Sequence, residues 1–174
     1  QLLELMKFKK PQLDGKKRRL DAALTIYDLQ AIAKRRTPKA AYDYTDGAAG
    51  SELSLNRSRR AYARVEFTPR VLRNVADVDP SVTMLGKRSE LPFAFGPTGF
   101  TRMMHYIGEP AVSAVAGQAG IPFALSTLGT TSVEDLAAAT PDTRRWFQLY
   151  VSRDHESAAA LVKRAADSGY DTLI

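Results

Sequence analysis

The chain has 174 residues, and its composition, 44% hydrophobic and 9% aromatic, is ordinary for a single folded domain. It contains no cysteine, which excludes a disulfide scaffold, a thiolate metal site and cysteine catalysis within these residues, and its two histidines disfavour a zinc site. No apolar run reaches the roughly 18 residues that span a bilayer, and the N-terminal residues lack a secretory signal pattern, so we expect a cytoplasmic protein without a metal.

The net charge of +6 is concentrated near the N-terminus, where residues 7–19 hold seven lysines and arginines and the first twenty residues contain only two acidic residues, Glu4 and Asp14. We therefore divide the chain into a basic extension, residues 1–23, and a folded part, residues 24–174. A basic segment can bind nucleic acid or an anionic membrane, because both present closely spaced phosphates. The absence of interleaved aromatics and of a nucleic-acid motif argues against nucleic acid. A solvated extension and a peripheral membrane contact through residues 7–19 remain open.

The first predicted elements of the folded part are helices. Apolar residues recur on one helical face between Ile26 and Ala33, and Pro38 interrupts the pattern, so residues 24–41 predict two short helices. The elements expected next are a loop at 45–50, a charged helix at 52–64, and extended segments at 67–72 and 82–86.

From residue 92 onward, short apolar segments alternate with amphipathic ones, at a spacing typical of βα repeats. Ala158, Leu161 and Ala165 form the narrow apolar face that a helix needs to cover a parallel sheet. The expected strands are 92–96, 122–126, 145–151 and 171–174, and the expected helices are 109–119, 132–139 and 154–168. The expected caps are Ser132 and Asp154 at helix N-termini, and Gly120 and Gly169 at helix C-termini.

These elements give three βα units and the opening strand of a fourth. The expected fold class is therefore α/β, a (β/α)8 TIM barrel of which the chain holds only the N-terminal helices and the first three to four βα units, since a whole barrel needs eight strands and about 250 residues. A last strand at 171–174 would have an unpaired edge and an uncovered face, so we expect the chain to be part of a longer protein.

Polar residues stand where the predicted strands end, and ligands bind at that end of a barrel. Hydroxyl, amide and phenol groups there suit a flat heteroaromatic ligand with carbonyl and N–H edges. Strand-end caps and core hydroxyls are the alternative, and the residues alone leave both open. The residues concerned are Pro97, Thr98 and Gly99 after the first strand, Ser126 at the end of the second, and Gln148 and Tyr150 in the third.

Six motifs, in their order and spacing, resemble the FMN-dependent α-hydroxy acid dehydrogenases and oxidases, a family that includes L-lactate dehydrogenase, glycolate oxidase and mandelate dehydrogenase. The resemblance covers residues 24–174, and the sequence segments are most similar to those of the bacterial quinone-linked L-lactate dehydrogenases. The motifs are YDY at 42–44, FTPRVLRNV at 67–75, PTG at 97–99, LST at 125–127, SVEDL at 132–136 and WFQLY at 146–150.

The resemblance implies FMN as cofactor and oxidation of an (S)-2-hydroxy acid, with L-lactate and its product pyruvate expected and with quinone or oxygen taking the electrons. It implies that Ser126 and Gln148 hydrogen-bond the flavin ring. It also implies that Tyr44 binds the substrate carboxylate and that Tyr150 contacts the substrate hydroxyl as a catalytic residue. The segment that it places against the flavin is Pro97, Thr98 and Gly99.

Two residues depart from the family pattern: Gly99 stands where several oxidases carry alanine, and Leu128 stands where glycolate oxidase has tryptophan, which implies a different side-chain pocket. His105 and His155 lie outside the sequence context of the family's histidine base, so we expect them to be non-catalytic. In the family this base, the carboxylate-binding arginine and the phosphate site come from later strands.

We therefore expect this chain alone to be inactive and the intact enzyme to be a homo-oligomer. The alternative hypothesis is an inactive half-barrel that serves only to associate with a separate C-terminal piece.

Overall fold

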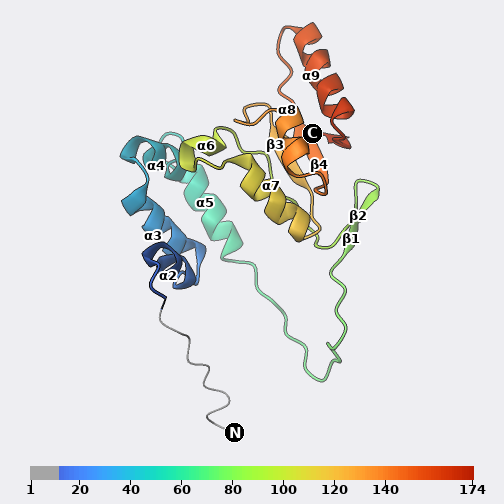
Figure 1. Cartoon of the computed structure of the whole chain (residues 1–174). Helices are drawn as coiled ribbons and strands as arrows, with labels where there is room; N and C mark the ends of the chain where they lie inside the picture. The colour runs from blue at the N-terminus through green and yellow to red at the C-terminus, as the bar shows by residue number, and fades with distance from the viewer. Residues whose placement is uncertain (1–11) are drawn as a thin grey trace. The chain divides into compact units, whose positions relative to one another are not determined.

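The computed structural model describes residues 12–174, and the chain divides into two compact units, residues 1–59 and residues 60–174 (Figure 1). Residues 7–11 of the predicted basic segment lie outside the described residues. Within residues 12–174, no helix is both long enough and apolar enough to cross a bilayer.

The described part of the first unit is helical, with α2 (Gly15–Asp21), α3 (Ile26–Arg36) and α4 (Lys39–Asp46). Helix α5 (Leu53–Tyr62) runs across the boundary between the units. The two short helices expected at 24–41 are confirmed as α3 and α4, and the charged helix is confirmed as α5. Helix α4 continues to Asp46, so the loop expected at 45–50 begins two residues later, at Gly47.

Side-chain caps determine where the helices of the first unit begin. Thr25 and Asp28 form a reciprocal capping box at the start of α3, and the hydrogen bonds from Thr25 lower the pKa of the Asp28 carboxyl. Asp14 accepts hydrogen bonds from the backbone N–H groups of Lys16 and Lys17 and so begins α2. Helix α2 lies inside the segment treated as a basic extension and was not expected from the sequence.

The second unit opens with an antiparallel hairpin of β1 (Val82–Met84) and β2 (Lys87–Ser89), in which Val82 lies opposite Ser89. Leu85 and Gly86 both have positive φ, as a two-residue hairpin turn requires. The extended segment expected at 82–86 is therefore β1 and its turn. The sequence did not indicate the charged return strand β2. The extended segment expected at 67–72 forms no strand.

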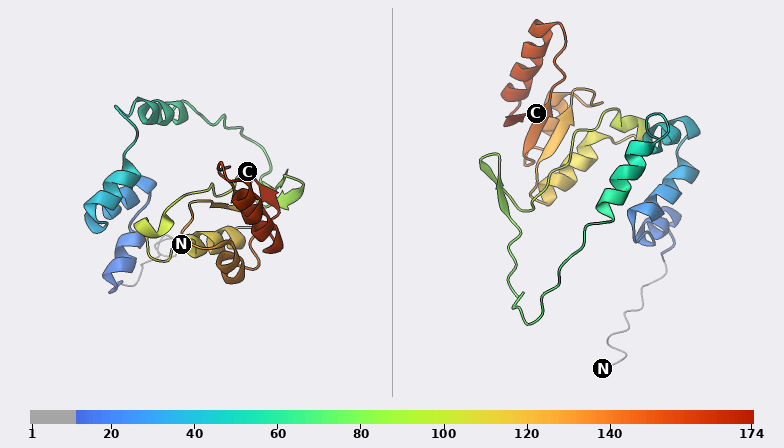
Figure 2. Two further views of the ribbon diagram at one scale, coloured as in Figure 1. Left: turned by 90° about the horizontal axis from the view of Figure 1, so that it is seen from above. Right: turned by 180° about the vertical axis from the view of Figure 1, so that it is seen from behind.

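Three parallel strands follow, β3 (Phe123–Ser126), β4 (Arg145–Gln148) and β5 (Thr172–Leu173), in the order β3-β4-β5. They alternate along the chain with α7 (Glu109–Gln118), α8 (Val133–Ala139) and α9 (His155–Asp167), as Figure 2 shows from two further directions. A short helix, α6 (Thr101–Met104), precedes α7. The predicted alternation of parallel strands and helices is confirmed.

Two expected strands are wrong in extent. The strand expected at 92–96 is a single bridge between Phe95 and Phe123, flanked by two prolines that have no N–H to donate to a ladder. The strand expected at 145–151 ends at Gln148, because the N–H of Tyr150 bonds to the hydroxyl of Thr127, 3.1 Å away, instead of to a neighbouring strand.

The core of the second unit lies between the sheet and its helices. Phe123, Leu125 and Phe147 pack in one buried cluster with residues of α7, α8 and α9. Because successive side chains of a strand point to opposite faces, Ser126 and Gln148 lie on the face away from this cluster. The helices thus cover one face of the sheet, as in the wall of a barrel.

The predicted caps are confirmed in this unit. Ser132 accepts a hydrogen bond from the N–H of Asp135, and Asp154 accepts hydrogen bonds from the first turn of α9. Gly120 and Gly169 follow α7 and α9 with positive φ, which is the left-handed conformation that ends a helix.

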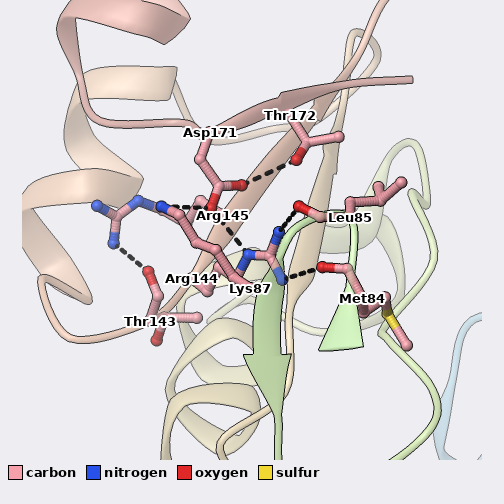
Figure 3. A network of polar contacts seen from close by, with 8 residues as sticks. All are labelled: Met84, Leu85, Lys87, Thr143, Arg144, Arg145, Asp171 and Thr172. Carbon is pink, nitrogen blue, oxygen red and sulfur yellow. Dashed lines mark hydrogen bonds and ion pairs between the residues drawn. The ribbon is translucent and has the colours of Figure 1, made fainter. Parts of the chain in front are cut away.

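The hairpin is fixed to the N-terminal ends of β4 and β5 (Figure 3). Arg144 Nε donates to Asp171 Oδ2 at 2.8 Å, and Arg144 Nη1 donates to the carbonyl of Met84 at 2.7 Å. Lys87 of β2 forms an ion pair of 2.9 Å with the same Asp171 carboxylate. The neighbouring guanidinium, that of Arg145, is buried and donates to backbone carbonyls, including that of Thr143 at 2.9 Å. Both guanidinium groups therefore have partners within the chain, although Arg145 Nε itself is buried without one among the described residues.

Candidate functional site

The carboxyl ends of β3 and β4 meet in a small polar cluster. Ser126 and Gln148 are partners in the parallel register, and Ser126 Oγ donates to Gln148 Oε1 at 3.3 Å. The backbone N–H of Thr127 donates to the same Oε1 at 3.4 Å, and the N–H of Leu128 donates to Ser126 Oγ at 3.1 Å. The structure therefore brings together the two side chains that the sequence predicted to bind a flavin ring.

This cluster leaves hydrogen-bonding capacity unused. Gln148 Oε1 is occupied, but within the described part of the chain the Nε2 group of Gln148 has no hydrogen-bond partner. Ser126 is buried, and Gln148 is half-buried. Because Gln148 is only half-buried, its amide nitrogen is accessible to solvent or to a ligand. The cluster can thus donate two N–H groups to a carbonyl-bearing ligand.

Tyr150 lies beside this cluster through its backbone. Thr127 Oγ1 donates to the carbonyl of Gln148 at 2.5 Å and accepts from the N–H of Tyr150 at 3.1 Å. These two bonds turn the chain away from the strand direction, and the Tyr150 side chain is exposed. Its phenol has no hydrogen-bond partner among residues 12–174, so its O–H can interact with a ligand.

The segment predicted to lie against a flavin packs beside the loop that follows β3. The N–H of Phe100 donates to the carbonyl of Leu128 at 3.0 Å, and a Cβ added at Gly99 would lie 3.0 Å from the Cβ of Leu128. Pro97 and Thr98 are exposed. The two residues that depart from the family pattern, Gly99 and Leu128, therefore contact each other, and no motif in the sequence indicates this contact.

One residue of this region was not predicted at all. Glu109, at the start of α7, is 1% exposed, and its carboxylate accepts hydrogen bonds from Thr130 N–H at 2.6 Å and from the Thr131 hydroxyl at 2.8 Å. Burial alone would raise the pKa of Glu109, but the hydrogen bonds from Thr130, from its own backbone and from Thr131 outweigh it and lower the pKa to about 2. In the sequence, Glu109 looks like a first-turn helix acid, and nothing there links it to a pair of threonines 21 residues away.

The remaining sequence candidates are Tyr44, His105 and His155. Tyr44 belongs to α4 in the first unit and is exposed, so its place in the site stays a prediction. His105 stacks on Tyr106 with ring centroids 4.7 Å apart, and His155 is the first residue of α9. Neither histidine is hydrogen-bonded to the cluster. Among the described residues, no group of three His, Asp or Glu side chains could hold a metal ion.

A family model described as FMN-dependent dehydrogenase matches residues 33–174. The chain belongs to this family. It is 53% identical, over 173 residues, to a Mycobacterium tuberculosis protein provisionally named L-lactate dehydrogenase, with 99% of this chain and 42% of that protein covered. It is 37% identical to 4-hydroxymandelate oxidase of Amycolatopsis orientalis, with 87% of this chain and 42% of that protein covered.

Solved structures agree with these relatives. A crystal structure of mandelate oxidase superimposes with a TM-score of 0.81 at 37% identity and covers 87% of this chain and 45% of its own. An (S)-mandelate dehydrogenase gives a TM-score of 0.79 at 38% identity, with 85% and 41% covered. The chain thus spans about two fifths of the length of the relatives it matches, and it holds the N-terminal helices and first units of their (β/α)8 barrel. The predicted fold class is confirmed.

FMN is the cofactor of this family, which confirms the cofactor prediction. The residues at the ends of β3 and β4 fit it. A flavin ring has carbonyl and N–H groups along one edge, and the unpartnered Gln148 amide and the rotatable hydroxyl of the buried Ser126 are complementary to them. The matched relatives are named as dehydrogenases and oxidases, and the comparisons do not support the alternative of a pure association module.

Proposed function

We propose that the protein containing these residues oxidises an (S)-2-hydroxy acid to a 2-oxo acid, and that its substrate is L-lactate, which gives pyruvate. The observation that carries the proposal is the Ser126–Gln148 pair, with its free amide donors at the ends of two parallel strands, in a chain of the FMN-dependent dehydrogenase family. The 53% identity to a relative provisionally named L-lactate dehydrogenase favours lactate over mandelate or glycolate.

The residues of this chain would bind and orient the cofactor and the substrate. Ser126 and Gln148 hydrogen-bond the polar edge of the flavin ring, and the segment of Pro97, Thr98 and Gly99 lies against the ring. When bound, FMN supplies the redox chemistry by accepting two electrons from the substrate. The backbone hydrogen bond from Phe100 to Leu128 supports this assignment, because it keeps the 97–100 segment next to the loop that begins at Ser126.

Two tyrosines would bind the substrate itself. Tyr44 donates its phenolic O–H to the substrate carboxylate, and Tyr150 donates to the substrate oxygen as the hydroxyl becomes a carbonyl. A hydrogen-bond donor near developing negative charge stabilises that charge, and the exposed phenol of Tyr150, unpartnered within residues 12–174, is available for this. We expect the base that removes the hydroxyl proton to come from residues outside this chain, with His105 and His155 non-catalytic, so residues 1–174 alone should be inactive.

We further propose that quinone or oxygen reoxidises the enzyme. We place the enzyme in the cytoplasm as a homo-oligomer that does not bind nucleic acid. We also propose that residues 7–19 bind an anionic membrane surface. The charge distribution favours the last point. Residues 1–59 contain thirteen Lys and Arg against seven Asp and Glu, whereas residues 60–174 contain twelve of each. Salt-sensitive binding to anionic vesicles would support the membrane contact, and tighter binding to DNA would contradict it.

The substrate is tested by mixing the full-length, FMN-loaded protein that contains these residues with L-lactate without oxygen and recording the visible flavin spectrum. We expect L-lactate to bleach the flavin faster than glycolate or (S)-mandelate, with D-lactate as the stereochemical control. Adding a quinone or oxygen to the bleached protein identifies the acceptor. If L-lactate left the flavin oxidised, the substrate assignment would be wrong, and the failure of all these acids would contradict the enzyme proposal.

A further inference from the structure

A buried carboxylate, Glu109, binds the loop that follows β3. Thr130 donates to it through its backbone N–H at 2.6 Å and through its hydroxyl at 2.8 and 2.9 Å, and Thr131 donates through its hydroxyl at 2.8 Å. Within residues 12–174, no other side chain is hydrogen-bonded to this carboxylate. Glu109 therefore acts on one loop, and this loop begins at Ser126.

The same interaction reaches the segment proposed to lie against the flavin. The hydroxyl of Thr130, which donates to Glu109, also accepts from the backbone N–H of Arg102 at 3.3 Å. A hydroxyl can do both, since it has one donor and two acceptor sites. On the other side of the loop, the N–H of Phe100 donates to the carbonyl of Leu128. The 97–102 segment is thus joined to the loop at two points, and one of them depends on a hydroxyl held by Glu109.

The loop has little room to shift. A Cβ added at Gly129 would lie 2.8 Å from Leu125 Cδ1, 2.9 Å from the carbonyl oxygen of Ser126 and 3.5 Å from Glu109 Oε1. The backbone therefore passes directly over the end of β3, with the carboxylate close by. A displacement of Thr130 would move this backbone and, through the Leu128 N–H, the hydroxyl of Ser126.

We propose that Glu109 is a positioning residue of the flavin site: by holding Thr130 and Thr131, its carboxylate fixes the Ser126 loop and the 97–102 segment relative to one another, and so sets the placement of the groups that contact FMN. The inference rests on the proposed function, because it takes Ser126 and Gln148 as ring-binding residues. Glu109 itself does not touch the cofactor. It remains ionised throughout the neutral range, since its pKa is held near 2.

The test compares two glutamine substitutions in the FMN-loaded protein with its full chain. Glu109→Gln removes the charge and half of the acceptor capacity. Glu134→Gln is the matched control, because Glu134 is also an acidic residue in the first turn of a helix. Its pKa is also lowered to about 2, mainly by the hydrogen bond from Arg164. Unlike Glu109, Glu134 is exposed, and it pairs at 2.7 Å with Arg164 on α9. The measurements are the FMN dissociation constant, the visible absorption band of bound FMN, and the unfolding midpoint without FMN.

We expect Glu109→Gln to raise the FMN dissociation constant about tenfold and to shift the visible band, because charge-assisted hydrogen bonds hold the loop. Glu134→Gln should change the constant by less than about twofold, as for an exposed pair. A Glu109→Gln protein that is less stable yet binds FMN with the wild-type affinity and spectrum would overturn the inference, since the role would then be structural only. A wild-type protein that does not bind FMN would overturn the proposed function as well.

A second pair of variants decides the matter if Glu109→Gln does not fold. Thr130→Val removes the hydroxyl that joins Glu109 to Arg102 N–H, whereas Thr130→Ser keeps it. We expect the valine variant to weaken FMN binding and shift the band in the same direction as Glu109→Gln, and the serine variant to restore both. Equal FMN binding and equal spectra in the two variants would contradict the inference.

Discussion

The two ends of the three-stranded sheet differ in how their polar groups are used. At the N-terminal end, Asp171 binds both Arg144 and Lys87, and Arg144 also donates to the carbonyl groups of Met84 and Leu85 in the β1–β2 hairpin (Figure 3). At the C-terminal end, the Gln148 amide nitrogen and the Tyr150 phenol have no partner within the described residues. At the N-terminal end the charged groups are thus paired within the chain, with Arg145 Nε and Trp146 Nε1 as buried donors without a partner in the described residues, whereas the C-terminal end presents accessible donors.

This difference separates stability from function within one unit. Burial alone would raise the pKa of Asp171, but the hydrogen bonds from Lys87, Arg144 and Thr172 lower it, so this carboxylate is stabilised by the protein alone. The Gln148 amide nitrogen and the Tyr150 phenol at the other end have no partner within residues 12–174 and are accessible to solvent or to the proposed ligand. In barrel enzymes the ligand-binding face is at the C-terminal ends of the strands, and the unpartnered donors of this chain lie at the same ends. Substitutions at the two ends should therefore affect different measurements.

The largest effect on stability is expected from Asp171→Ala. The carboxylate is 16% exposed and binds two cations, so its removal leaves Arg144 and Lys87 without an anion. We expect the free energy of unfolding, measured by urea denaturation, to fall by about 3 kcal/mol, with FMN affinity unchanged. Asp167→Ala is the control, because Asp167 forms an exposed pair with Lys163, and it should cost less than about 1 kcal/mol. If Asp171→Ala lost FMN affinity while its free energy of unfolding stayed unchanged, the assignment of stability to the N-terminal end and of function to the C-terminal end would be wrong.

A somewhat smaller effect should appear as a pH dependence at Glu109. Its pKa is about 2 in the folded protein and 4.5 in its ordinary state, so its ionised form stabilises the fold above about pH 4.5, and this stabilisation is lost as the pH falls toward about 2. At pH 7 the free energy of unfolding of the wild type should exceed that of Glu109→Gln by on the order of 2 kcal/mol, and this difference should shrink as the pH falls. A difference that stayed constant from pH 7 to pH 3 would contradict the depressed pKa.

Gly99→Ala should have an intermediate effect at the functional end. The new methyl group would lie 3.0 Å from Leu128 Cβ, which is attached directly to the backbone and cannot rotate away. We expect overpacking to lower the free energy of unfolding by about 1 kcal/mol. We also expect a change in FMN binding, whereas Asp171→Ala should leave FMN binding unchanged. Because Leu128→Gly removes the opposing Cβ, the double variant should recover part of the loss. Additive effects of the two substitutions would mean that they are not coupled.

The alternation of strands and helices was predictable because it depends on local signals, such as the apolar spacing of α9, the Asp154 cap and the glycine that follows each helix. Strand ends were not predictable in the same way. The strand at 92–96 shrank to one bridge, and β4 ended at Gln148, because a proline at the start of a strand and a hydroxyl on a neighbouring loop decide these boundaries. The Thr127 contact is tertiary and leaves no periodic pattern in the sequence, whereas the effect of the prolines is local.

The site shows a similar division. Ser126 and Gln148 were identified from their motifs, and the parallel register then explains why they meet. The contact between Gly99 and Leu128, and the binding of Thr130 by Glu109, join residues 29 and 21 positions apart that carry no common motif. Sequence reasoning therefore proposed the groups that would face a ligand and missed the contacts that hold their loops in place.

The smallest effect on stability is expected from Tyr150→Phe, and this variant tests the functional end most directly. The Tyr150 phenol is exposed and has no hydrogen-bond partner in residues 12–174, so its loss should change the free energy of unfolding by less than about 0.5 kcal/mol. If the phenol donates to the substrate oxygen during oxidation, flavin reduction by L-lactate should slow at least about tenfold, while FMN affinity stays at its wild-type value. Reduction at the wild-type rate would remove Tyr150 from the catalytic assignment, and the available donors of this end would then be reduced to the amide of Gln148.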